Sequence, residues 1–308
     1  MRGWHHVGMT AASHDPGEPA SAKAVSIPLA ARVHLAHAVV QHLAERAGAD
    51  LLHIKGPALL PDLRPATRSS SDVDVLVRPT HLHLLVAALE GAGWTKRSDF
   101  ATGSVFAHAA NWWHDDWGYV DVHVHWPGVR LPPEVAYAAW SADAETLDIA
   151  HVPCPVPDRT GQLLVLVLHA ARSTDRSDVE YAWDNADAEQ QAAVRTLART
   201  LDAEVALAAA LGELEQFRDD PAYELWRLFS QGGGTRFQEW RARFIATPGT
   251  RERAQLLAAS FRVNRDHLGM ELGRTPTRRD LRERQLLRVR RAARELRGLL
   301  GSRSGGTA

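Results

Sequence analysis

The stretch Arg68-Ser-Ser-Ser-Asp72-Val-Asp74-Val-Leu-Val77 decides how this chain is interpreted. Its valine-rich run from Val73 to Val77 predicts a buried strand. Side chains two positions apart share one face of a strand, so the carboxylates of Asp72 and Asp74 project together. Two adjacent negative charges repel unless cations neutralise them, and Mg²⁺ prefers carboxylate and phosphate oxygens. The pattern favours a metal site, although an isolated Asp-x-Asp is more often a solvated strand end.

A second piece of the same site precedes this strand. The run Asp50-Leu-Leu-His-Ile-Lys55 predicts a short buried strand that ends at Gly56-Pro57. Proline after glycine suits the first turn of a helix, and a glycine there lets backbone amides approach a phosphate closely. The Arg- and Ser-rich segment 64–71 is expected to be the loop between the two strands. Together these segments predict one phosphate-and-metal site.

A third carboxylate comes from Val120-Asp-Val-His-Val-His-Trp126. In a strand, Asp121, His123 and His125 share one face, and Asp121 can face the aspartate pair across the sheet. The two histidines are interpreted either as metal ligands or, preferably, as hydrogen-bonded imidazoles beside the site. The first interpretation predicts a zinc or manganese metallohydrolase that uses Asp121, His123 and His125 together with His114.

The rest of the chain predicts an α+β protein. A mixed sheet flanked by helices is expected over 26–157 and an all-helical domain over 158–300, with the proline-rich segment 153–157 as the hinge. Residues 1–25 and 301–308 are expected to be disordered. The predicted strands are 50–55, 72–77, 94–97, 103–109 and 118–125, and the predicted helices are 27–46, 57 onward, 79–91, 132–140, 163–171, 192–217, 223–229, 236–246, 251–261 and 278–300.

Composition narrows the functional class. The chain has 308 residues and a net charge of -1, from 36 Lys+Arg against 37 Asp+Glu, which does not favour a general nucleic-acid binder. The single cysteine, Cys154, excludes an internal disulfide and a cysteine-cluster zinc site. No run approaches the ~18 apolar residues of a membrane span, so a cytoplasmic protein without a membrane partner is expected. Nine arginines against three acids over 276–302 predict a helix that is either solvated or binds an acidic partner.

The motifs together resemble the uncharacterised nucleotidyltransferase family of the DNA polymerase β-type fold. The resemblance covers roughly residues 30–190, with Lys-Gly in place of the superfamily's usual Gly-Ser and an extra Val-His before Trp126. It implies that Mg²⁺, or alternatively Mn²⁺, is the metal and that a nucleoside triphosphate such as ATP is the co-substrate. The implied metal-binding and catalytic residues are Asp72, Asp74 and Asp121, and the implied nucleotide-binding residues are Lys55, Gly56, Arg68 and Ser71.

The resemblance also implies a reaction. Such an enzyme transfers a nucleoside monophosphate to a hydroxyl or similar group of a small molecule or peptide and releases pyrophosphate, with Asp121 helping to deprotonate the hydroxyl. Family members often lie beside peptide natural-product genes, which suggests a biosynthetic role. A catalytically inactive binding module of the same fold is the remaining alternative.

Overall fold

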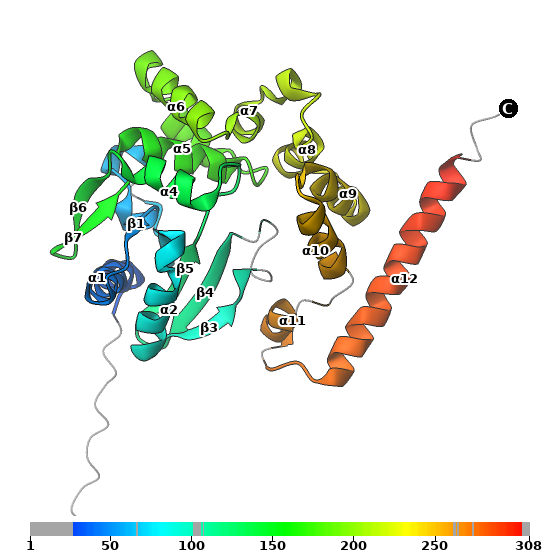
Figure 1. Cartoon of the computed structure of the whole chain (residues 1–308), viewed down its shortest axis with the longest axis horizontal. Coiled ribbons are helices and arrows are strands. Elements are labelled where there is room, and N and C mark those ends of the chain that lie inside the picture. Colours follow the sequence, from blue (N-terminus) through cyan, green and yellow to red (C-terminus); the bar gives the residue numbers. More distant parts are fainter. Residues whose placement is uncertain are drawn as a thin grey trace, which may run out of the picture.

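The computed structural model describes residues 27–65, 67–100, 106, 108–260, 263, 265–272 and 274–303. Its centre is a five-stranded sheet in the order β1-β2-β5-β4-β3 (Figure 1). Only β2 and β5 run parallel, and every other neighbouring pair is antiparallel. The strands are β1 (Leu51–His53), β2 (Asp72–Val77), β3 (Thr95–Ser98), β4 (Ala109–His114) and β5 (Gly118–His123). The predicted mixed sheet flanked by helices and followed by a helical region is confirmed.

One face of the sheet is mostly apolar, with His53 and Lys96 as polar exceptions, and packs on two helices, α1 (Leu29–Ala47) and α2 (Leu82–Gly91). Val73, Val75 and Val77 of β2 join this core and are fully buried. Because side chains alternate along a strand, Asp72 and Asp74 must project from the other face. Burial of the valines therefore determines which way the two carboxylates point.

The other face packs on the helices that follow the sheet. Leu76 and Trp126 share one core with α5, which is buried nearly all round because it lies between the sheet and the later helices. The Asp158 carboxylate caps the start of α5 by accepting a hydrogen bond from the Gly161 amide at 2.9 Å. These helices are α4 (Pro133–Ser141), α5 (Arg159–Ala170), α6 (Ala188–Thr200), α7 (Glu204–Leu211) and α8 (Tyr223–Gln231), with single turns at η4 (Val179–Trp183) and η5 (Leu214–Phe217).

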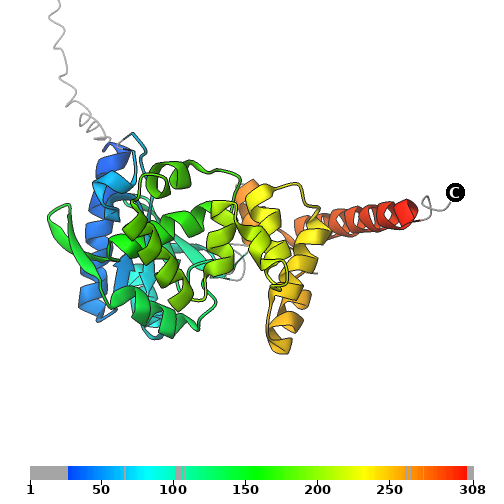
Figure 2. The same cartoon turned by 90° about the horizontal axis from the view of Figure 1, so that it is seen from above.

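The remaining helices are α9 (Arg236–Ala246), α10 (Thr250–Ser260), α11 (Arg265–Leu272) and α12 (Arg278–Arg303). In both views α12 extends away from the helices before it (Figures 1 and 2). It includes residues 301–303, which were expected in the tail, whereas 1–25 and 304–308 lie outside the described residues. None of the described helices is both long and apolar enough to cross a membrane.

Three local predictions are wrong. The helix expected from Pro57 is instead two 3-10 turns, η1 (Gly56–Ala58) and η2 (Pro61–Leu63). Pro61 lacks the amide that a continuing helix would need to bond the carbonyl of Pro57. The strand predicted to reach residue 125 ends at His123. The helix predicted over 192–217 is divided into α6, α7 and η5.

The proline-rich segment expected as a hinge is a strand. Val152–Val156 forms β7, which pairs with β6 (Glu145–Ile149) in a hairpin. Pro153 and Pro155 occupy alternate positions in β7, where a strand amide points away from its hairpin partner, so neither removes a bond between the two strands. Of the strand predicted over 103–109, residues 103–105 and 107 lie outside the described residues, Phe106 lies in a turn, and β4 begins only at Ala109.

Candidate active site between β2 and β5

Because β2 and β5 pair in parallel, two of the predicted carboxylates lie side by side on the same face of the sheet. Asp74 lies directly opposite Asp121 in the register, and Asp72 lies opposite Tyr119. Asp74 is only 3% exposed, whereas Asp121 and Asp72 are half-buried. The structure therefore places two of the three acids at the centre and Asp72 at the rim.

Asp74 has a partner at each oxygen. The Lys55 ammonium lies 2.8 Å from Oδ2, and Nε2 of His123 lies 2.8 Å from Oδ1. Burial by itself would raise the pKa of Asp74, but the Lys55 charge and the His123 hydrogen bond lower it well below its ordinary value. These two partners favour the ionised form of Asp74 and hold the carboxylate in a fixed orientation.

Asp121 behaves in the opposite way. Burial, reinforced by the charge of Asp74, raises the pKa of Asp121 to about 7. The Asn111 side-chain amide donates a hydrogen bond to Oδ1 of Asp121, and the Ser98 hydroxyl bonds the Asn111 carbonyl, which orients that amide. Two carboxylates on neighbouring strands therefore differ strongly in proton affinity, as expected of a site that moves a proton.

Asp72 and the turn that begins at Gly56, called the glycine turn below, form the edge of the site. Ser70 and Ser71 hydroxyls lie 3.2 and 3.4 Å from Oδ1 of Asp72. Burial and the charge of Asp74 raise the pKa of Asp72. Gly56 has φ +61°, and a Cβ at Gly56 would lie 2.9 Å from the Ser70 side chain, so both backbone and space require glycine there.

A small polar pocket opens beside these groups and encloses about 130 Å³. Arg68 does not line it. Its Nη1 instead donates to Asp178 and to Ser177, both at 2.7 Å. These bonds hold the loop that contains Ser69 to Ser71, called the serine loop below, against the segment before η4. The pocket is lined by Lys55, Arg64, Ser69, Ser70, Ser71, Asp72, Asp74 and His169.

A divalent cation fits the chemistry of this donor set. Asp74, Asp121 and His123 each offer a ligand atom, and these atoms lie within 4.8 Å of one another. Burial lowers the pKa of His123 to about 4, so the ring is neutral and donates from Nε2 to Asp74. Its Nδ1 is buried without a partner among the described residues. Carboxylate oxygens suit Mg²⁺ or Mn²⁺ better than they suit softer metals.

The predicted metallohydrolase set does not assemble. His114 lies opposite Gly118, whereas His123 lies opposite Ala109, so the two histidines are at opposite ends of the β4–β5 pair. His114 packs on Trp94, with ring centroids 4.8 Å apart. His125 lies beyond the end of β5 and, within the described ranges, is not in the group that can hold a metal.

Residues 30–218 match the model of a family described as uncharacterised nucleotidyltransferase. The chain belongs to this nucleotidyltransferase family. The matched residues include the whole sheet, the acidic site and the helices through α7, while α8 to α12 lie beyond them. No curated protein matches the chain.

Three solved structures are similar to this nucleotidyltransferase at low identity. A lincosamide antibiotic adenylyltransferase, LnuA, with lincomycin bound is 14% identical over 52% of this chain and 92% of its own, with a TM-score of 0.31. The antibiotic-resistance factor ANT(2'')-Ia is 14% identical over 61% and 95%, with a TM-score of 0.35. An antigenic nucleotidyltransferase-like protein from Paracoccidioides brasiliensis is 16% identical over 61% and 89%, with a TM-score of 0.37.

Arg172, to which sequence reasoning assigned no role, shares the ring of Trp126 with Lys55 in the candidate site of this nucleotidyltransferase. Arg172, just after α5, lies 5.5 Å from the ring centroid, and the Lys55 ammonium lies 5.7 Å from it. Nη1 of Arg172 donates to Nε2 of His108 at 2.8 Å. Burial lowers the pKa of Arg172, while the charges of Asp74 and Asp121 oppose this change. The segment that ends at Arg172 carries the family resemblance, but no motif marks Arg172 as facing the acids.

A buried pair of histidines lies beneath the glycine turn. Nδ1 of His37 lies 2.8 Å from Nδ1 of His53, and Nε2 of His53 lies 3.1 Å from the side-chain oxygen of Gln41. Gln41 donates to Glu45, so its oxygen accepts from His53 and Nδ1 of His53 accepts from His37. Burial lowers the pKa of both rings, that of His37 to about 3. Two neutral rings with fixed tautomers therefore connect α1 to β1 immediately before Lys55.

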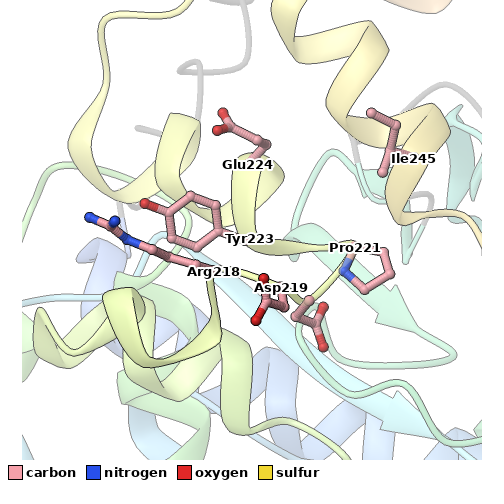
Figure 3. Close-up of a pocket in the computed structure, with 7 residues that line it drawn as sticks. Arg218, Asp219, Pro221, Tyr223, Glu224 and Ile245 are labelled. Atoms are coloured by element: carbon pink, nitrogen blue, oxygen red, sulfur yellow. The ribbon is translucent and has the colours of Figure 1, made fainter.

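A larger cavity, of about 540 Å³, lies away from the acidic site between η5, α8 and α9 (Figure 3). Tyr223 and Glu224 of α8 face it from one side and Ile245 of α9 from the other. It contains none of the predicted site residues. Its lining residues are Arg218, Asp219, Asp220, Pro221, Tyr223, Glu224 and Ile245.

Proposed function

We propose that this nucleotidyltransferase moves a nucleoside monophosphate from a nucleoside triphosphate to a hydroxyl group of a small molecule or peptide. The observation that carries the proposal is the placement of Asp74 opposite Asp121, with Asp72 at the rim of a polar pocket. Membership of the family supports the reaction class. Three acids beside hydroxyl and ammonium donors are the groups that metal-dependent transfer to phosphorus requires.

Asp72, Asp74 and Asp121 would hold the divalent cation, Mg²⁺ or Mn²⁺. When bound, this cation would neutralise charge on the triphosphate. Lys55 and Ser71 would orient the phosphates beside Asp74, and Gly56, which has no side chain, would let the phosphates approach the backbone closely. The acceptor oxygen attacks the α-phosphorus, the bond from that phosphorus to the bridging oxygen breaks, and pyrophosphate leaves with the bond electrons. The hydroxyl proton passes to the carboxylate of Asp121, a role supported by the pKa of this group, which burial and the charge of Asp74 raise in the metal-free site.

The proposal extends to the setting of the reaction. A cytoplasmic location rests on the lone Cys154, which is buried and unpaired. A small-molecule or peptide acceptor in natural-product biosynthesis is proposed from the resemblance, and nucleic acid is not favoured because the net charge is close to zero.

The test measures pyrophosphate release. Purified protein is incubated with Mg²⁺ and each nucleoside triphosphate, with and without small-molecule extract of the producing cell, and acceptors are identified by their mass increase. We expect release that depends on both extract and metal, and a loss of at least about 10²-fold in Asp74→Asn. Asp115→Asn, on the exposed β4–β5 turn, is the matched control. Equal turnover by Asp74→Asn and the unchanged protein would contradict the proposal.

A further inference from the structure

Arg64 lines the polar pocket and has no hydrogen-bond or ion-pair partner among the described residues. Its side chain is half-buried, and its Nε is completely buried with no hydrogen-bond acceptor. The guanidinium makes no hydrogen bond or ion pair with any residue in the described part of the chain. An arginine carries five donors and keeps its charge, so leaving it partly desolvated and unpaired is costly. Such an arrangement indicates a partner that arrives from solution.

The position of Arg64 is set by local structure. It directly follows η2, where Leu63 is anchored in the core at 3% exposure, and its backbone is extended. The extended backbone leads the chain from η2 into the loop of Ser69 to Ser71. Arg64 is therefore supported by the fold and does not depend on a salt bridge for its placement.

Arg68 is half-buried like Arg64, but it does not line the pocket and its guanidinium is paired. Its guanidinium is engaged by Asp178 and Ser177 at 2.7 Å and by Asp175 at 3.7 Å. Asp178 also bonds His169 at 3.3 Å, so the Arg68 contact is one part of a network that holds the serine loop against the helical region. Releasing Arg68 to a ligand would leave the buried Asp178 carboxylate with a weaker set of partners.

The groups around Arg64 define the chemistry of the missing partner. Lys55 and three consecutive serines, Ser69 to Ser71, line the same pocket. Ser70 and Ser71 bond Asp72, and Lys55 pairs with Asp74 but has more than one N–H to donate. Burial lowers the pKa of Arg64, and the nearby carboxylate of Asp178 opposes this change. A ligand with several acceptor oxygens and more than one negative charge satisfies these donors, and a planar guanidinium matches two oxygens of a phosphate at once.

We infer that Arg64 binds the phosphate chain of the nucleoside triphosphate, while Arg68 positions the serine loop and does not contact the nucleotide. The inference rests on the proposed function and changes the arginine assigned to the triphosphate. Arg64 then contacts substrate directly, and its loss weakens binding of any ligand that carries the phosphate chain. Loss of Arg68 acts through the loop and lowers stability first.

The test uses isothermal titration with tripolyphosphate, ATP and AMP in the presence of Mg²⁺. Tripolyphosphate reports on the phosphate subsite whatever base the enzyme prefers. We expect Arg64→Gln to weaken tripolyphosphate and ATP binding by about 10- to 100-fold, the usual loss for hydrogen bonds to charged groups, and AMP binding much less. Arg64→Lys, which keeps the charge and loses the paired donors, is expected to show an intermediate loss and serves if Arg64→Gln does not fold. Arg68→Gln is expected to lower the melting temperature with less than about a threefold loss of affinity.

Arg97→Gln, an exposed arginine on β3, is the control for loss of one positive charge. Unchanged tripolyphosphate affinity in folded Arg64→Gln or Arg64→Lys overturns the inference, as does a larger loss in Arg68→Gln than in Arg64→Gln. If the unchanged protein binds ATP and releases pyrophosphate while these variants bind normally, only the inference fails. If the unchanged protein binds neither ATP nor tripolyphosphate, the proposed function fails with it.

Discussion

The Lys55 ammonium forms a 2.8 Å ion pair with Asp74, the most deeply buried acid of the site. Lys55 itself is 17% exposed, so the pair lies at the floor of the pocket. In the metal-free protein this lysine supplies the positive charge that the clustered carboxylates need. Removing one partner of such a buried pair leaves an uncompensated charge, which is strongly destabilising.

We therefore expect Lys55→Met to lower the free energy of unfolding of the metal-free protein by about 3 kcal/mol. Saturating Mg²⁺ is expected to restore much of the loss, because a bound cation stabilises the folded state by mass action. Urea unfolding followed by circular dichroism, with chelator or with Mg²⁺, measures both effects. Lys96→Met, an exposed lysine on β3, is the control, and equal stability of the two variants without metal would refute this account of Lys55.

Asp121→Asn is expected to stabilise the metal-free protein while it abolishes transfer. The folded-state pKa of Asp121, about 7, lies above its ordinary value of 3.8, so the folded state holds the extra proton between these values. The contribution of Asp121 to stability is therefore greatest below pH 3.8 and is lost as the pH rises through 7. Asparagine has no charge to lose and can still accept from Asn111. At pH 8 in chelator we expect a gain of at least about 1 kcal/mol in unfolding free energy, and a loss would contradict the assignment.

Gly56→Ala combines an unfavourable backbone angle with a close contact. An alanine at position 56 would have to adopt φ +61°, and its Cβ would lie 2.9 Å from the Ser70 side chain. We expect a loss of about 2 kcal/mol in unfolding free energy and weaker tripolyphosphate binding, because the serine loop must shift. Gly48→Ala is matched in angle, at φ +67°, but has open space around the new methyl group. It should cost only about 1 kcal/mol and leave binding unchanged, so equal effects of the two substitutions would exclude a role for the Ser70 contact.

The buried pair of His37 and His53 predicts that the free energy of unfolding decreases at acid pH. The folded-state pKa of His37 is about 3, below its ordinary value of 6.5, so the unfolded state binds more protons between these values. The contribution of the neutral ring is complete above pH 6.5 and is lost as the pH falls toward 3. We expect His37→Gln to reduce the slope of unfolding free energy against pH in this window by up to about 1.4 kcal/mol per pH unit. The exposed His42→Gln variant should keep the original slope, and a slope unchanged by His37→Gln would show that another group titrates.

Several features of the site could be predicted from local pattern. The alternation of Asp72, Asp74 and the valines determined which side chains share a face, since period two is a property of any strand. The same argument placed Asp121 and His123 together, and the structure has both beside Asp74. The Lys-Gly turn was correctly located, although its helix was not, because Pro61 interrupts the hydrogen bonds a few residues later.

The partners of these side chains depended on tertiary structure. Arg68 pairs with Asp178, which is 110 positions away, and no local pattern distinguishes it from Arg64. His37 and His53 meet only because α1 packs on the sheet, and Arg172 reaches Trp126 only because α5 packs in the same core as Trp126. Strand and helix periods are local properties of the chain. The sequence alone therefore indicated which acids share one face of the sheet, and its motifs indicated the family. Distances between remote segments follow from packing of the whole core, which alone decided which cation neutralises which acid and which arginine stays free for a ligand.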